Sequence, residues 1–290
     1  MISIKLTNLA YIIIYETKKI PIDILKKKPD KVKEYINYSY FKYGSIESTN
    51  YFANLLLETL RRKDFDFFSD EVYFSSTFFS GTPSACHYLR DVLVDKINKE
   101  ALLKGHPSVH KFDFLQRKRK SSFKDYGKLN FKERQKSQKQ NNGFLCIPQI
   151  RDSSKLVIVN DISVTGSQLT HQQEVLTSIH LPKNIIYLFI YTLDEEVKKR
   201  KDTLLENKLN NYAFKSSKRF SEFLIKNIET RNIYINKRLI LKLLNIEDIY
   251  YKKIIEKFDQ DFKNKFLSLA LNDNMHIVSK YRKRLLDLNS

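Results

Sequence analysis

Cysteine is scarce in this chain of 290 residues: Cys86 and Cys146 lie far apart, in no CxxC or Cys/His spacing. The sequence therefore predicts neither a disulfide framework nor a zinc site, and we expect a reducing, cytoplasmic compartment. Long apolar runs are missing as well. The stretch AYIIIY at 10–15 is too short to cross a bilayer and is followed by charged residues, so we expect a buried strand there and no membrane partner.

Common nucleotide and nucleic-acid signatures are also missing. The sequence has no GxGxxG, no GK[ST], and no helix-turn-helix, RNA-recognition or zinc-finger pattern. These absences exclude a Walker loop and a dinucleotide fingerprint, and they leave backbone-directed contact as the expected mode for any nucleic-acid partner. Acidic residues are outnumbered, 33 against 52 Lys and Arg, giving a net charge of +19. That charge attracts nucleic acid, phosphorylated small molecules or an anionic surface, and alone it does not choose among them.

Apolar periodicity predicts an α/β fold with a helical C-terminal extension. The expected strands are 10–15, 71–79, 110–116, 144–148, 155–159 and 184–193, with helices at 46–62 and 85–103. Strands without polar alternation are typical of parallel sheets covered by helices on both faces. From about 195 onward only amphipathic helical patterns remain. We therefore expect an α/β domain over 1–194 and a helical region over 195–290.

The least apolar stretch is 117–142, a basic loop with ten Lys and Arg residues against Asp125 and Glu133. A loop of this length inside a compact domain is usually functional or disordered. Two roles stay open for it: a lid that closes over a diphosphate, or a surface for a nucleic-acid backbone. In the second case, a C-terminal cluster would extend the surface: Lys280, Arg282, Lys283 and Arg284.

The stretch KLVIVNDISVTGSQL at 155–169 has the pattern of a strand, a polar loop and a helix start. Backbone N–H groups at such a helix start form an anion site, and Gly166 would let a phosphate approach closely. Asp161, which we place just past the strand end, could accept hydrogen bonds from a sugar diol. An ordinary strand-to-helix turn also favours Asp, Thr, Gly and Ser, so spacing alone leaves both readings open.

LVIVNDISVTGSQL resembles the phosphoribosyl-diphosphate (PRPP) motif of type I phosphoribosyltransferases, in which an apolar strand, two acids and three variable residues precede Thr-Gly-x-Thr/Ser. YFKYGSIESTNYFANLL at 40–56 is similar to an early segment of the ComF-like branch, and the basic stretch before the motif is similar as well. Phosphoribosyltransferase-like proteins also occur in antiphage systems. The resemblance covers roughly 40–193 and implies a type I phosphoribosyltransferase-like parallel sheet.

The resemblance implies roles for particular residues. The ribose 5′-phosphate would be wrapped by Val164, Thr165, Gly166, Ser167 and Gln168, and the ribose hydroxyls would face Asn160 and Asp161. The pyrophosphate loop would comprise Ser80, Gly81, Thr82 and Ser84, and the basic loop would open with Arg117, Lys118, Arg119 and Lys120. Lys42 is the best single lysine for a ligand contact. Mg²⁺ would be carried by the ligand's own oxygens, with no metal site in the protein, and a homodimer is expected.

The chain also departs from the family pattern. Asn160 stands where an acid is usual, Val164 where members acting on purines carry another, and Gln168 where a hydroxyl residue is usual. Losing a carboxylate beside a developing ribosyl cation would raise the barrier by about a few kcal/mol. Two hypotheses follow: a PRPP-binding transferase with a nitrogenous acceptor, or a catalytically weakened fold acting as a nucleotide- or nucleic-acid-binding effector, for example in a retron-type antiphage system.

Two histidines near the motifs are expected to be non-catalytic. His87 begins the helix after the SGTPS loop, and His171 lies in the first turns of the motif helix. A base role is conceivable for His87, but histidines at such positions more often cap a helix or lie on its surface.

Overall fold

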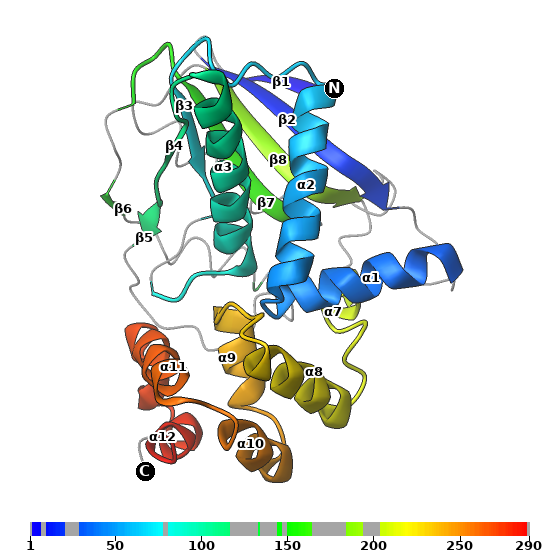
Figure 1. The fold of residues 1–290 in the computed structure, drawn as a ribbon, viewed down its shortest axis with the longest axis vertical. Helices are drawn as coiled ribbons and strands as arrows, with labels where there is room; N and C mark the ends of the chain where they lie inside the picture. Colours follow the sequence, from blue (N-terminus) through cyan, green and yellow to red (C-terminus); the bar gives the residue numbers. More distant parts are fainter. Residues whose placement is uncertain are drawn as a thin grey trace.

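The computed structural model describes residues 2–6, 10–20, 29–77, 81–116, 133, 144–146, 150–163, 184–193 and 204–288. These residues contain a six-stranded sheet with the order β1-β2-β8-β7-β3-β4 (Figure 1). Its strands are β1 (Ile2–Leu6), β2 (Ala10–Ile20), β3 (Val72–Ser75), β4 (His110–Lys111), β7 (Lys155–Ser163) and β8 (Asn184–Leu193). β1 runs antiparallel to β2, and all other pairs are parallel. A separate antiparallel pair joins β5 (Leu115–Gln116) and β6 (Phe144–Cys146).

The described residues of this α/β part include the helices α1 (Pro29–Lys42), α2 (Ile46–Arg62) and α3 (Ala85–Lys104). Figure 1 shows α2 and α3 side by side across one face of the sheet. The chain then continues through α7 (Leu204–Asn210), α8 (Ser217–Glu229), α9 (Lys237–Leu243), α10 (Asp248–Ile255), α11 (Gln260–Asn272), the 3-10 helix η3 (Met275–Ile277) and α12 (Ser279–Leu286). Helices α8 to α12 gather beyond the end of the sheet at which α3 begins (Figure 1).

The central strands are buried on both faces, as their unbroken apolar pattern predicts. Alternate side chains of a strand point to opposite faces. Val157 and Val159 of β7 belong to the core beneath α2 and α3, whereas Leu156 and Ile158 pack with Tyr187 on the opposite face. This arrangement confirms the α/β class.

The helical region has a second core of its own. Its largest fully buried side chains include Phe220 on α8, Tyr251 on α10 and Phe266 on α11. Helix α8 begins where the Ser216 hydroxyl accepts a hydrogen bond from the N–H of Arg219 at 3.3 Å, the usual N-cap arrangement. Among the described residues of the α/β part, those that pack into this core lie near the end of α1, such as Tyr43.

A short backbone junction holds the two regions together. Gly44, in a left-handed conformation at φ 92°, accepts a hydrogen bond from the N–H of Tyr234 at 2.7 Å. A Cβ at Gly44 would lie 2.0 Å from the Tyr234 carbonyl oxygen, so only glycine fits. Tyr88 on α3 donates to the Ile235 carbonyl at 2.9 Å and stacks on Tyr234 with ring centroids 4.4 Å apart. The helical region is therefore fixed against α1 and α3.

Several element boundaries differ from the sequence prediction. β7 extends to Ser163, so Asp161 lies within the strand and not past its end, because the backbone there still pairs with β8. The stretch 110–116 divides into β4 and β5, and β3 ends at Ser75. Helix α1 was not predicted at all, since its lysines obscure the apolar spacing. Among the residues that the structure describes, none of the helices combines the length and the apolar character needed to cross a bilayer.

Candidate functional site

The strand order reverses between β3 and β7. From β3 the chain moves outward to β4, then returns to β7 and continues to β8 on the other side. In open α/β sheets, ligands bind beyond the carboxyl ends of the strands at such a reversal. The Ser76 hydroxyl, just after β3, donates to the Val159 carbonyl of β7 at 3.1 Å and ties the two strand ends together. The structure thus brings the described part of the predicted ribose motif, Asn160 and Asp161, to the same edge of the sheet as the residues that follow β3.

Asp161 is the acid at this edge, and its carboxylate is already engaged. The Lys42 ammonium forms an ion pair with Oδ2, and the Tyr38 hydroxyl donates to the same oxygen at 3.2 Å. Oδ1 accepts from the backbone N–H of Ile162 at 2.8 Å. Tyr38 and Lys42 lie one turn apart on α1, so both reach the same carboxylate. Lys42 and Asp161 are only 7% and 4% exposed, so solvent screens their attraction little.

Asn160 lies beside Asp161 but serves as a neutral acceptor. Its Oδ1 accepts from the backbone N–H of Asp161 at 2.8 Å and from the Cys86 thiol at 3.4 Å. Burial raises the pKa of Cys86, so the thiol keeps its proton and donates. The amide therefore joins the start of α3 to the end of β7 and brings no negative charge to the site.

The described part of the predicted pyrophosphate loop, 81–84, is packed against the helical region. The Thr82 hydroxyl donates to the Leu269 carbonyl of α11 at 2.7 Å, and the N–H of Lys237 donates to the Pro83 carbonyl at 3.1 Å. Gly81 is forced to be small, because a Cβ there would lie 2.7 Å from Oδ1 of Asp273. The loop is thus held by helices more than 150 residues later in the chain.

His87 is a buried capping residue, so of the two non-catalytic positions expected for it, capping or the helix surface, the structure shows capping. Its Nδ1 lies 3.2 Å from the N–H of Ser84 and 2.9 Å from the Ser84 hydroxyl, at the start of α3. Burial, with the neighbouring Arg90 guanidinium, lowers the pKa of His87 to about 4. The imidazole is therefore neutral near pH 7 and fixes the N-terminus of α3 toward the site.

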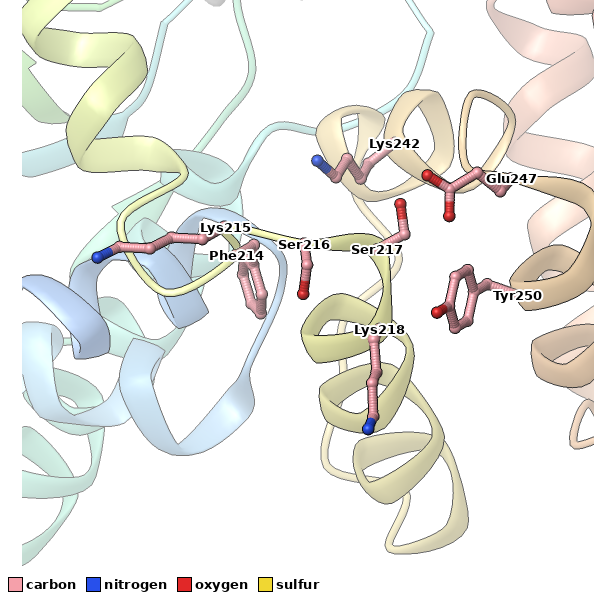
Figure 2. Close-up of a pocket in the computed structure, with 8 residues that line it drawn as sticks. All are labelled: Phe214, Lys215, Ser216, Ser217, Lys218, Lys242, Glu247 and Tyr250. Carbon is pink, nitrogen blue, oxygen red and sulfur yellow. The ribbon is translucent and has the colours of Figure 1, made fainter.

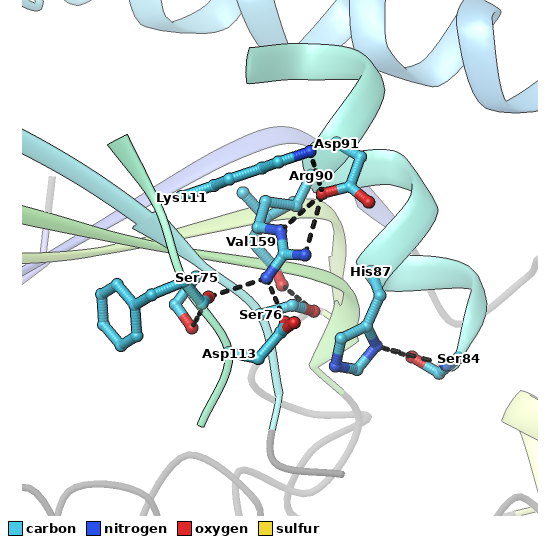
Figure 3. Close-up of polar contacts among 10 residues, drawn as sticks. Ser75, Ser76, Ser84, His87, Arg90, Asp91, Lys111, Asp113 and Val159 are labelled. Atoms are coloured by element: carbon cyan, nitrogen blue, oxygen red, sulfur yellow. Dashed lines mark hydrogen bonds and ion pairs between the residues drawn. The ribbon is translucent and has the colours of Figure 1, made fainter. Parts of the chain in front are cut away.

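Arg90, one turn further along α3, was not identified from the sequence. Its guanidinium is buried, donates to the Phe112 carbonyl at 2.7 Å and pairs with Asp91 at 2.8 Å and with Asp113. The Ser75 hydroxyl donates to the same Phe112 carbonyl at 3.0 Å. Figure 3 shows these groups converging from α3, β3 and the segment after β4. Arg90 therefore positions the chain that follows β4, and the charge spacing along α3 gave no signal for it.

Two charged residues of the helical region influence the pKa of Tyr38. Glu206 on α7 is 6% exposed, and a terminal nitrogen of Arg238, at the start of α9, is buried. The pKa of Tyr38 is raised by burial and next by the charge of Glu206, while Arg238 lowers it to a smaller extent. Since Tyr38 touches Asp161, both charges act close to the ribose motif.

Several predicted residues lie outside the described part of the chain. They are Ser80, Arg117, Lys118, Arg119, Lys120, Val164, Thr165, Gly166, Ser167, Gln168 and His171. Of the predicted site, the structure therefore places Asn160 and Asp161, the loop at 81–84, and Lys42. Lys42 contacts Asp161, and Cys86, two residues after the loop, contacts Asn160, so the structure adds Tyr38 and Cys86 to the predicted site.

A pocket of about 410 Å³ lies elsewhere, where α8, α9 and α10 meet. Lys215, Lys218 and Lys242 line it, but in Figure 2 their ammonium groups spread apart and do not converge on one point. Lys242 instead lies 5.8 Å from the centre of the Phe220 ring. None of the residues that line this pocket belongs to the sheet edge. The site indicated by the fold is therefore the β3–β7 edge.

Comparison with known protein families agrees with this geometry. A family model described as PRTase ComF-like matches residues 27–288, which is most of the chain. The chain belongs to the ComF-like phosphoribosyltransferase family. No curated protein matches the sequence. The family match extends across the helical region, so this ComF-like fold includes helices α7 to α12 as well as the sheet.

The protein's own side chains do not form a metal site in the part of the chain that is described. No group of three or more His, Cys, Asp or Glu side chains there could hold a metal ion. The two oxygens of Asp161 already accept from Lys42, Tyr38 and Ile162. This donor set does not fit a divalent cation held by the protein.

Proposed function

We propose that this ComF-like protein binds PRPP or a related ribose phosphate at the carboxyl ends of β3 and β7. The observation that carries the proposal is the hydrogen bond from Cys86 to Asn160, which joins the start of α3, directly after the loop at 81–84, to the end of β7 at the point where the strand order reverses. Asp161 would accept from the ribose hydroxyls, the N-terminus of α3 would face the diphosphate, and 164–168 would hold the 5′-phosphate. Mg²⁺ would arrive on the ligand's phosphates and hydroxyls.

The reaction that this fold supports is transfer of the ribosyl phosphate to a nitrogenous acceptor. In that reaction the bond from C1 of the ribose to pyrophosphate breaks, the new bond to nitrogen forms, and positive charge develops on the ribose between the two events. A carboxylate near the ribose stabilises that charge. Here Lys42 neutralises Asp161 and Asn160 is uncharged, so transfer should be slow relative to binding.

The second candidate is therefore a catalytically weakened protein that acts through nucleotide or nucleic-acid binding, for example as an effector in an antiphage system. The buried Lys42–Asp161 pair favours it. The exposed basic residues of the helical region would serve a nucleic-acid backbone: Lys252, Lys253, Lys257, Lys280, Arg282 and Lys283. Arg284 does not join them, because its guanidinium is buried over the Tyr251 ring and pairs with Asp248.

Isothermal calorimetry with PRPP, with and without Mg²⁺, tests the binding site. We expect saturable binding by the wild type, about a tenfold loss in Asp161→Ala, and wild-type affinity in Asp152→Ala. Asp152 is the matched control, since it is exposed near the opposite end of β7. Absence of heat at millimolar PRPP would contradict the proposal.

Turnover and nucleic-acid binding separate the two candidates. Release of pyrophosphate in the presence of purine and pyrimidine bases would be measured for the wild type and for Asn160→Asp. A marked gain in Asn160→Asp supports the weakened enzyme, whereas fast release in the wild type that the substitution leaves unchanged rejects it. For nucleic acid, log Kd should rise steeply with log salt concentration, and a flat plot rules out contact with the phosphate backbone.

A further inference from the structure

Thr82 lies in the predicted pyrophosphate loop, but its side chain is committed to the helical region. It is 3% exposed, and its hydroxyl donates to the Leu269 carbonyl of α11 at 2.7 Å. A threonine hydroxyl has one proton to donate, so this bond leaves none for a phosphate oxygen, which only accepts. In this structure Thr82 can therefore place the loop, but its hydroxyl does not donate to an anion.

The backbone of the same loop still has donors for an anion. Pro83 has no N–H, and the N–H of Ser84 lies 3.2 Å from Nδ1 of His87. None of the residues that the structure describes accepts a hydrogen bond from the N–H of Gly81 or of Thr82. Backbone N–H groups need a partner, and successive ones form concavities that bind anions. The loop would therefore hold a diphosphate through its main chain, and the affinity would depend on the conformation of that main chain.

Helices α9 and α11 fix this main chain on both sides of Thr82. At Gly81 the packing is so close that a Cβ would lie 2.7 Å from Oδ1 of Asp273, the residue that follows α11. The Pro83 carbonyl accepts from the N–H of Lys237, the first residue of α9, at 3.1 Å. Three successive residues of the loop are thus held by the helical region.

An ion pair joins the two helices behind the loop. The Lys237 ammonium lies 3.2 Å from Oδ2 of Asp273, whose side chain is 2% exposed. Asp273 lies against Gly81, and the backbone of Lys237 bonds to Pro83, so the pair connects both ends of the contact. It also offsets a negative charge that would otherwise repel an anion at the loop.

We propose that Thr82 is a positioning residue, which through α11 sets the main chain of the loop at 81–84 for the diphosphate of a ribose phosphate ligand. The inference rests on the proposed function and deepens it, because the helical region becomes part of the diphosphate site. Docking of that region and binding of a diphosphate are then coupled, and each strengthens the other. A ligand that lacks the diphosphate, ribose 5-phosphate, binds independently of Thr82.

Calorimetry with PRPP and with ribose 5-phosphate, both with Mg²⁺, isolates the contribution of the diphosphate. In Thr82→Val, which removes the hydroxyl at nearly constant volume, we expect PRPP to bind about tenfold more weakly and ribose 5-phosphate to bind as in the wild type. Thr82→Ser keeps a hydroxyl and should retain most of the PRPP affinity. The matched control is Thr59→Val, because the buried Thr59 hydroxyl donates to the Leu55 carbonyl within α2 at 2.8 Å. It should bind both ligands as the wild type does.

Hydrogen exchange of the wild type tests the coupling without any substitution. We expect saturating PRPP to slow amide exchange in α11, and saturating ribose 5-phosphate to leave it unchanged. This measurement decides the matter if Thr82→Val does not fold. Equal exchange in α11 with the two ligands overturns the inference.

The calorimetric outcomes are distinct. No binding of PRPP or of ribose 5-phosphate by the wild type overturns the proposed function and this inference together. Binding of PRPP that Thr82→Val leaves unchanged overturns this inference alone. Equal losses for the two ligands in Thr82→Val, or an equally large loss of PRPP affinity in Thr82→Ser, also overturn it, because the hydroxyl would then have no specific effect on the diphosphate.

Discussion

Removing Lys42 should destabilise the protein severely, because it leaves a buried carboxylate without its counter-charge. Lys42 and Asp161 are 7% and 4% exposed, so solvent screens the attraction between their charges little. In Lys42→Met, the donors to Asp161 that remain among the described residues are the Tyr38 hydroxyl and the N–H of Ile162. Breaking a buried pair by deleting one partner costs about 3–5 kcal/mol. That is a large share of a total stability of roughly 5–15 kcal/mol.

The assay is urea unfolding at pH 7 for the wild type, Lys42→Met, Asp161→Asn and the double variant. We expect a coupling energy of at least about 1.5 kcal/mol, because the double variant no longer buries an unpaired charge. The matched control is Lys155→Met at the other end of β7, where Lys155 pairs with Asp70 at 3.1 Å in a more exposed position. Its loss should cost about 1 kcal/mol or less. Equal costs for the two lysine variants, with coupling near zero, would refute the reasoning.

Two further predictions concern the junction and the start of α3. Gly44→Ala should lower the free energy of unfolding in urea by about 3 kcal/mol or more, since the new Cβ would lie 2.0 Å from the Tyr234 carbonyl oxygen. Gly105→Ala is the control, because a Cβ at Gly105 would have no atom within 4 Å. Equal losses of stability in the two variants would contradict the steric argument. His87 has a pKa of about 4 in the folded protein, below the value of about 6.5 in the unfolded chain. As the pH falls, the unfolded chain therefore binds the proton first. The protein should lose stability between about pH 6.5 and pH 4. In His87→Gln, the loss of stability between about pH 6.5 and pH 4 should be smaller by up to about 3 kcal/mol. An unchanged dependence of stability on pH would exclude His87 as its origin.

Much of the fold could be predicted from the sequence because its signals are local. The apolar runs of β7 and β8 and the periodic faces of α2 and α3 decide their own secondary structure. Their lack of polar alternation also indicated a sheet covered on both faces. The end of β7 was harder to predict, because Asn160 and Asp161 are polar residues inside a buried strand and their side-chain partners, Cys86 and Tyr38, lie on other elements.

The contacts of the site were less predictable, since they join residues far apart in sequence. Lys42 and Asp161 are separated by 119 positions, and no local pattern reveals that one faces the other. Tyr38 and Lys42 at helical spacing were a signal, but only once α1 was known to be a helix. Arg90 and Glu206 gave no signal at all, because an isolated charge in an amphipathic helix usually lies on the surface.

The cost of these buried charges is an argument that the sheet edge serves a ligand. Lys42 and Asp161 from the α/β part are buried at the β3–β7 edge, and burial and the charge of Glu206 raise the pKa of Tyr38 beside them. Apolar residues of similar volume in place of a buried ion pair are often neutral or stabilising by about 1–4 kcal/mol. Stability alone therefore does not account for charges at this position. Their location does account for them if the charges recognise a polar ligand, because open α/β sheets bind ligands where the strand order reverses.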